Sequence, residues 1–167
     1  MDIRLDPITP DRKCAFAQLI NLYNFNYDFT NYLNDDIPEE GFFYGDADYY
    51  MSHEKAQNFF IRVDGKIAGY AVIMTGDCHY LDDATAHSID EFFVTRKYRR
   101  MGVGTAAALQ VFRMFPGTWE VCHLDDSERA QAFWKAVIGA YTNGSYRICT
   151  KEDDDLVGII FENSSLL

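Results

Sequence analysis

The sequence predicts a mixed α/β domain, in which a mostly antiparallel central sheet contains one splayed parallel pair of strands and is flanked by helices. Apolar residues alternate with polar ones before Asp64-Gly65, and an apolar strand pattern follows this turn pair, which indicates a β-hairpin. Two strand patterns, at about 87–95 and 118–123, are separated by a segment with helical periodicity. That order favours a parallel pair joined by a crossover helix. Two further strand patterns, at about 145–150 and 156–162, follow.

The N-terminal third is the least regular part of the pattern. A short strand is expected at 3–8, and Pro10-Asp11 then begins a helix. The apolar positions of this helix repeat with a period of 3.6 residues at Phe16, Leu19, Ile20 and Tyr23. The stretch 25–55 is rich in Tyr, Asn and Asp, and we expect short helices and a loop there.

The remaining elements have clearer boundaries. The hairpin strands should cover about 59–63 and 67–74. A helix is predicted over 103–115, where Pro116-Gly117 ends it, and a second over about 127–138. The apolar positions of the second helix are Ala130, Phe133, Trp134 and Val137.

Composition limits the classes of function. The chain has 167 residues, the usual length of one domain, so 1–167 is treated as a single unit. Its formal net charge is −11, which argues against nucleic acid because that affinity depends on Lys and Arg neutralising phosphates. An acidic surface can attract a cationic substrate, or it can serve solubility alone.

The sequence contains no signal for a metal site or a membrane span. The four cysteines form no CxxC pair, and His79 near Asp82 and Asp83 resembles a metal cluster only superficially. No apolar run approaches the roughly 20 residues that span a bilayer. The N-terminus lacks the apolar core of a signal peptide. We therefore expect a cytoplasmic protein with reduced thiols, no metal and no membrane partner.

A basic, glycine-containing turn lies between the strand at 87–95 and the helix at 103–115. The first N–H groups of a helix lack internal partners, and the helix dipole is positive there, so such a terminus binds phosphate. Glycines let a ligand approach the backbone closely, and arginines add positive charge. The turn reads Arg99-Arg100-Met101-Gly102-Val103-Gly104-Thr105. The alternative is a plain turn with two solvated arginines.

The spacing Arg99-x-x-Gly102-x-Gly104, after Phe92-Phe93-Val94, resembles the [RQ]xxGx[GA] motif of GNAT N-acetyltransferases. The resemblance covers roughly 56–142, and the N-terminal third matches only in length and general character. The strand segment IDEFFV is similar to that of diamine and polyamine N-acetyltransferases. The longer pattern also resembles a bacterial group of acetyltransferases with no assigned substrate.

The resemblance implies a GNAT acyltransferase fold that uses acetyl-CoA as cosubstrate. The pantetheine arm would lie between the splayed strands, against the backbone of Phe92, Phe93 and Val94. The turn would bind the pyrophosphate. The second family motif is kept approximately by Phe133, whereas Ser127 replaces the usual Asn. Ser127 could bind the cofactor or serve as the N-cap of its helix.

The resemblance also implies direct attack of an amine on the acetyl thioester. An alkyl ammonium must first lose a proton, which a carboxylate can accept. Asp90 and Glu91 precede the pantetheine strand, and the family register favours Asp90. Adjacent strand residues face opposite sides, so only one of them is expected to line the cleft. Both could instead be structural, and His87 and His123 are alternative bases.

The general acid is an open question in this sequence. Trp134 stands where the family often has a Tyr that protonates the departing thiolate, and an indole N–H cannot act as that acid. Tyr141 is a substitute candidate. Coenzyme A can also leave as the thiolate without an acid.

Three functions fit these sequence features. The first is acetylation of a small, cationic amine, drawn by an acidic patch at Asp35, Asp36, Glu39 and Glu40. The second is acetylation of a protein or peptide. The third is a non-catalytic acyl-CoA sensor or partner protein, which the missing Tyr favours. A homodimer is compatible with all three.

Overall fold

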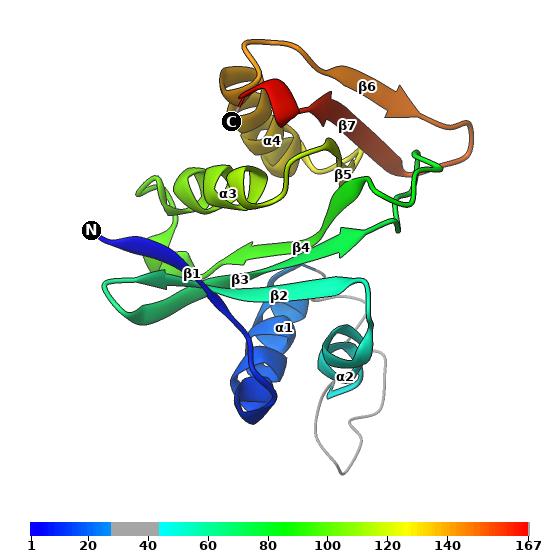
Figure 1. Cartoon of the computed structure of the whole chain (residues 1–167). Helices are drawn as coiled ribbons and strands as arrows, with labels where there is room; N and C mark the ends of the chain where they lie inside the picture. Colours follow the sequence, from blue (N-terminus) through cyan, green and yellow to red (C-terminus); the bar gives the residue numbers. More distant parts are fainter. Residues whose placement is uncertain (28–43, 167) are drawn as a thin grey trace.

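A single sheet organises the molecule. The computed structural model describes residues 1–27 and 44–166 (Figure 1), and in it seven strands follow the order β1-β2-β3-β4-β5-β7-β6. All neighbouring strands are antiparallel except β4 and β5. The strands are β1 (Ile3–Pro7), β2 (Ala56–Val63), β3 (Lys66–Thr75), β4 (His87–Val94), β5 (Thr118–Leu124), β6 (Arg147–Thr150) and β7 (Leu156–Glu162).

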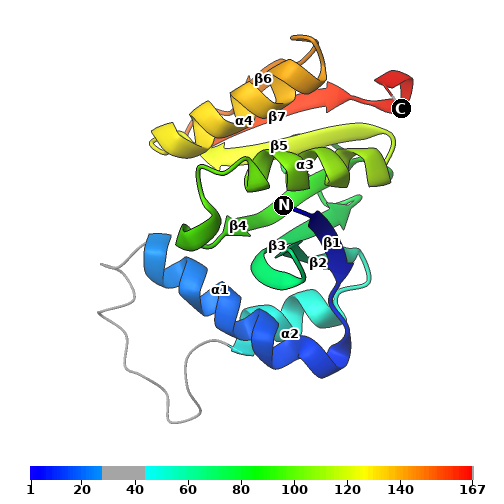
Figure 2. The same cartoon turned by 90° about the vertical axis from the view of Figure 1, so that its left-hand side faces the viewer.

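Helices cover both faces of this sheet. They are α1 (Lys13–Tyr27), α2 (Tyr44–Ser52), α3 (Val103–Met114) and α4 (Glu128–Tyr141). In Figure 1, α1 and α2 lie below the first half of the sheet, α3 lies above it, and α4 lies beside β7. Figure 2 shows α1 and α2 together on one side of β1 to β4 and α3 on the other. The mixed α/β fold expected from the sequence is confirmed.

The two faces have separate apolar cores. Under α1 and α2 the buried side chains include Phe16, Phe60 and Tyr70. Under α3 and α4 they include Phe112 and Trp119. Within the described residues, none of the helices is long and apolar enough to cross a membrane.

The turns follow the expected chemistry, with small shifts in element ends. Asp64 and Gly65 both have positive φ, at 48° and 77°, and they join paired residues Val63 and Lys66. These values match the two-residue turn with two positive φ angles that fits the twist of a hairpin. The strand expected from 145 begins at Arg147, because Gly144, at φ 81°, still belongs to the preceding turn.

Candidate active site

The parallel strands β4 and β5 separate partway along their length. They pair at only three positions, from His87 with Trp119 to Ile89 with Val121. β4 continues to Val94 and β5 to Leu124 without further pairing to each other. The backbone of the second half of β4 therefore has no strand on its β5 side, and such an edge can accept an extended ligand.

A β-bulge lies where the two strands separate. Val72 of β3 pairs with Glu91 and Ile73 pairs with Ile89, so Asp90 is the extra residue. A bulge interrupts the alternation of side chains along a strand. The hydroxyl of Tyr50 from α2 donates to Asp90 at 2.6 Å, and that of Tyr70 donates to Glu91 at 3.3 Å.

Both carboxylates consequently face the side of the sheet covered by α1 and α2. The alternation of side chains on which the sequence expectation rested is interrupted here, because strict alternation holds only in an unbulged strand. Which of the two carboxylates lines a cleft stays a prediction. On either side of the pair, Ile89 and Phe92 pack with the core on the α3 and α4 side.

The electrostatic surroundings distinguish the two carboxylates. Burial, and then the charge of Asp90, raises the pKa of Glu91 from 4.5 to about 8, and Asp46 contributes in the same direction. The hydrogen bond from Tyr70 opposes this shift. Asp90 itself is exposed. Glu91 is therefore the carboxylate whose proton affinity lies near neutral pH, where a general base is most effective.

The glycine turn presents a bare helix N-terminus. Gly102, at φ 77°, is the N-cap of α3 and has no side chain with which to cap it. Arg100 also has a positive φ, 63°. A Cβ on Gly104 would lie 3.3 Å from the ring of Phe133 in α4, so the start of α3 lies close against α4. The local geometry suits an anion that binds at the first turn of α3.

Three arginines, near enough for their charges to act on one another, lie where β4 ends and where α4 begins. Arg99 donates through Nε to the carbonyl of Val94 at 2.7 Å, and its guanidinium lies 5.4 Å from the centre of the Phe93 ring. Burial and the charges of Arg129 and Arg96 lower the pKa of Arg99. Sequence reasoning missed Arg129, although its place in the first turn of α4 was a usable signal. Concentrated positive charge in a chain of net charge −11 fits a polyphosphate ligand.

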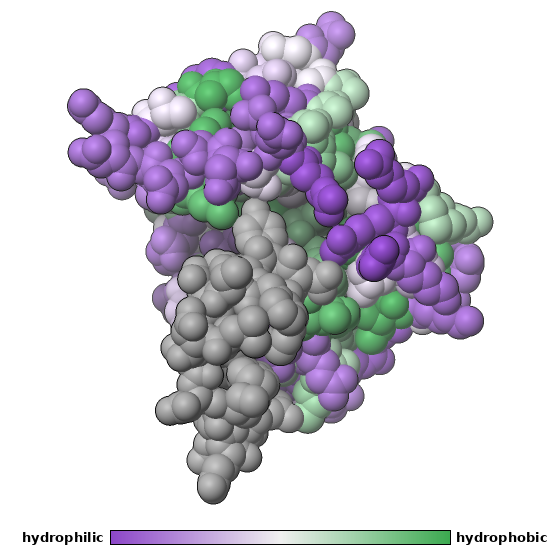
Figure 3. All heavy atoms as spheres, turned by 180° about the vertical axis from the view of Figure 1, so that it is seen from behind, coloured by the Kyte–Doolittle hydropathy of each residue, from purple (hydrophilic) through white to green (hydrophobic). Residues whose placement is uncertain are grey.

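Apolar rings line the inner part of the site. The ring of Phe92 stacks on that of Phe133 at 6.0 Å and meets that of Trp134 edge-on at 5.1 Å. Trp134 is 6% exposed. Seen from behind, the molecule has a hollow with apolar atoms at its floor, between polar surfaces (Figure 3). Ser127 is the N-cap residue of α4, and its side chain makes no capping hydrogen bond.

The structure separates the other proposed residues from the carboxylate pair. Tyr141 packs in the core against Phe112 and Phe161, and its buried hydroxyl has no hydrogen-bond partner among the described residues. His87 interacts with Thr75, and burial lowers its pKa. These contacts place neither residue beside Glu91.

His123 differs from these two residues. It lies on β5, two residues beyond the last pairing with β4. It is 5% exposed, and its Nε2 has no partner within the described segments. A buried nitrogen without a hydrogen-bond partner destabilises the fold unless a polar group binds it. The position of His123 therefore fits a ligand whose amide groups lie between β4 and β5.

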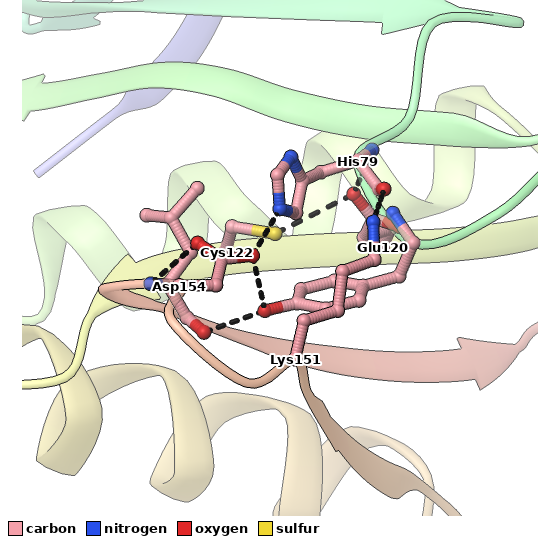
Figure 4. Close-up of polar contacts among 7 residues, drawn as sticks. His79, Glu120, Cys122, Lys151 and Asp154 are labelled. Atoms are coloured by element: carbon pink, nitrogen blue, oxygen red, sulfur yellow. Dashed lines mark hydrogen bonds and ion pairs between the residues drawn. The ribbon is translucent and has the colours of Figure 1, made fainter.

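A buried acid anchors the loop at 76–86 across the sheet (Figure 4). Glu120, 1% exposed, accepts the backbone N–H groups of His79 and Tyr80 at 2.6 and 2.8 Å. His79 also pairs with Asp154, and Lys151 donates to its carbonyl at 2.8 Å. No group that could hold a metal occurs in the described parts of the chain. This cluster therefore has a structural explanation.

A separated parallel pair, an uncapped helix N-terminus near arginines, and a carboxyl of raised pKa beside the gap are the features expected of an acyl-CoA-dependent acyltransferase. The model of the acetyltransferase (GNAT) family matches residues 17–140. The chain belongs to this family, as its turn motif indicated. None of the curated proteins compared matches the sequence. The acidic patch at 35–40 lies outside the described residues.

Solved structures show the same fold at low sequence identity. An acetyltransferase from Thermus thermophilus has a TM-score of 0.69 and 16% identity, covering 97% of each chain. The PaiA N-acetyltransferase from Thermoplasma acidophilum, in complex with coenzyme A, has a TM-score of 0.65 and 9% identity over 97% of this chain and 99% of that chain. A GNAT acetyltransferase from Staphylococcus aureus has a TM-score of 0.59 and 16% identity, over 96% of this chain and 99% of that chain.

Proposed function

We propose that this protein transfers the acetyl group of acetyl-CoA to the primary amine of a small cationic molecule. The observation that carries the proposal is the position of Glu91. Its carboxylate, with a pKa raised to about 8, lies at the bulge where β4 leaves β5. A base placed there meets an acceptor that enters from the α1 and α2 side.

The chain supplies groups for each part of acetyl-CoA. The backbone N–H groups at the start of α3, with Arg99 and Arg129, hold the phosphates. The unpaired edge of β4 from Phe92 to Val94 offers hydrogen bonds to the pantetheine amides. Acetyl-CoA supplies an activated thioester whose carbonyl carbon accepts a nucleophile.

Glu91 makes the acceptor reactive by removing a proton. An N–H bond of the ammonium breaks and the proton passes to the carboxylate, leaving a lone pair on nitrogen. This nitrogen bonds to the carbonyl carbon, the carbon–sulfur bond breaks, and its electrons leave on sulfur. The nitrogen's second proton ends on the sulfur, directly or through water. Trp134 donates no proton in this scheme.

The first test is a thermal-shift titration with acetyl-CoA, followed by an amine panel. Ligand at a hundred times Kd should add about 2.7 kcal/mol to the free energy of unfolding. The panel contains diamines, aminoglycosides, amino acids and lysine peptides, assayed by thiol release. We expect a shift together with turnover on small cationic amines.

Two other results would redirect the proposal. A shift without turnover on any amine would favour a non-catalytic acyl-CoA sensor. Turnover on peptides alone would favour a peptide acetyltransferase. A cytoplasmic location belongs to the same proposal, and the four cysteines are free thiols.

A further inference from the structure

Each carboxylate of the bulge is served by its own phenol, and the two phenols come from different elements. Tyr70 belongs to β3 and is fully buried. Tyr50 belongs to α2, outside the strands that form the gap. Burial, and then the bond to Asp90, raises the pKa of Tyr50, so the hydroxyl remains a hydrogen-bond donor. The 2.6 Å bond to Asp90 is the shorter of the two.

Tyr50 is itself held in place from two sides. Its backbone carbonyl accepts a hydrogen bond from the amide of Asn58 in β2 at 2.9 Å. Its ring packs against Phe16 of α1, with ring centres 6.4 Å apart. The direction of the hydroxyl toward Asp90 is thus set by the packing of α2 on the sheet.

Among the described residues, the titratable groups that act on Glu91 are acids and phenols. Asp90 comes from its own strand, Asp46 and Tyr50 from α2, and Tyr70 from β3. Tyr23 of α1 meets the ring of Tyr70 at 6.4 Å. None of the ion pairs recorded in the described part of the chain involves Asp90 or Glu91. A cation is the ligand that these charges would favour.

We propose that Tyr50 and Asp90 form a positioning pair for the acceptor. The Tyr50 hydroxyl fixes the negative charge of Asp90 beside Glu91, and this charge orients the ammonium form of a strongly basic alkyl amine. The ammonium N–H then points to Glu91, which takes the proton. This assignment rests on the proposed acetyl transfer and makes Asp90 a positioning residue, with Glu91 as the base.

The bond from Tyr50 also restricts the direction of the Asp90 carboxylate. Asp90 is exposed, so its remaining lone pairs are open to a ligand that arrives from solvent.

The test compares Asp90→Asn, the conservative Asp90→Glu, Tyr50→Phe and the matched control Tyr49→Phe. Tyr49 lies on the same helix and is 50% exposed. Three acceptors are compared. The first is the alkyl amine with the fastest turnover in the panel; the other two are benzylamine, which is charged near neutral pH, and aniline, which is of similar size and neutral. The kcat and KM for acceptor and for acetyl-CoA are measured across pH.

We expect Asp90→Asn to raise the acceptor KM by about tenfold or more, the worth of a charge-assisted hydrogen bond. It should also move the acid limb of kcat/KM to lower pH, because Glu91 loses a neighbouring negative charge. Tyr50→Phe should raise the acceptor KM by a smaller factor than Asp90→Asn does, and it should leave the KM for acetyl-CoA unchanged. Asp90→Glu should restore the acid limb, and Tyr49→Phe should match the wild type.

Two results would overturn the pair. The first is an Asp90→Asn enzyme with an unchanged acceptor KM and an unmoved acid limb. The second is a wild type that acetylates aniline as well as benzylamine and the alkyl amine. Failure of the proposed function is distinct, since the wild type would then bind acetyl-CoA and acetylate no amine at any pH.

Discussion

Replacing Glu91 with Gln should abolish catalysis and yet stabilise the protein at alkaline pH. The pKa of Glu91 rises from 4.5 to about 8 on folding. Each unit of pKa corresponds to about 1.4 kcal/mol, so full expression of this shift would cost about 5 kcal/mol. Glu91 keeps some contact with solvent, and we therefore expect a cost of a few kcal/mol. The glutamine oxygen can still accept the bond from Tyr70.

The sign of the pH dependence follows from linkage. Below pH 4.5 the carboxyl is neutral in both states and adds no difference between variant and wild type. Between pH 4.5 and about 8 only the unfolded state ionises, so the wild type loses stability as pH rises. Above about pH 8 the carboxylate is charged in both states, and the cost of charging it in the fold is fully present.

Urea denaturation at several pH values measures this difference. The stability gain of Glu91→Gln should be near zero at about pH 4 and reach its plateau above about pH 8. An equal difference at every pH would show that Glu91 is not held protonated by the fold. Loss of turnover with unchanged acetyl-CoA binding would complete the assignment of the base, whereas full turnover would remove it.

Three further predictions concern the cofactor turn and the anchored loop. Arg99→Ala should remove most of the thermal shift produced by acetyl-CoA, because the phosphates lose a charge-assisted donor. Gly158→Ala should lower the free energy of unfolding, measured in urea, by about 1–3 kcal/mol, because the added Cβ would lie 2.5 Å from the ring of Tyr80. Gly139→Ala is the control: it lies inside α4, the nearest contact of its Cβ would be 3.6 Å, and the change should be neutral or stabilising. Glu120→Gln should lower the free energy of unfolding by about 1–3 kcal/mol, because the NH₂ group of the glutamine cannot accept a hydrogen bond from a backbone N–H. Amide hydrogen exchange in 76–86 should become faster, and unchanged exchange would contradict the anchoring role.

The fold and the glycine turn before α3 could be predicted because their signals are local. The hairpin depends on two adjacent residues, Asp64 and Gly65, and the turn motif is a short continuous segment. Helix periods are likewise read within one segment. The ends of elements moved by a few residues, as at the strand that starts at Arg147, because neighbouring turns decide where pairing begins.

The details of the acceptor side could not be predicted because they depend on pairing between distant segments. The bulge at Asp90 exists only in the register of β4 against β3. The bond from Tyr50 joins residues 40 positions apart, and Tyr50 lies in the stretch 25–55, where the sequence pattern was the hardest to interpret. Glu120 gave one local signal, a charge within an apolar strand, but its partners lie about 40 residues earlier. The homodimer stays a prediction.

The arrangement of charge along β4 explains how an acidic chain can use an anionic cosubstrate. The acids lie at the bulge on the α1 and α2 side, whereas the arginines lie where β4 ends and α3 and α4 begin. Val94, whose carbonyl binds Arg99, lies further along the strand than Glu91 by a span of roughly 10 Å. That span is close to the screening length at physiological salt. In the proposed reaction, the phosphates and a cationic acceptor would therefore meet opposite local charges at two points along the same strand.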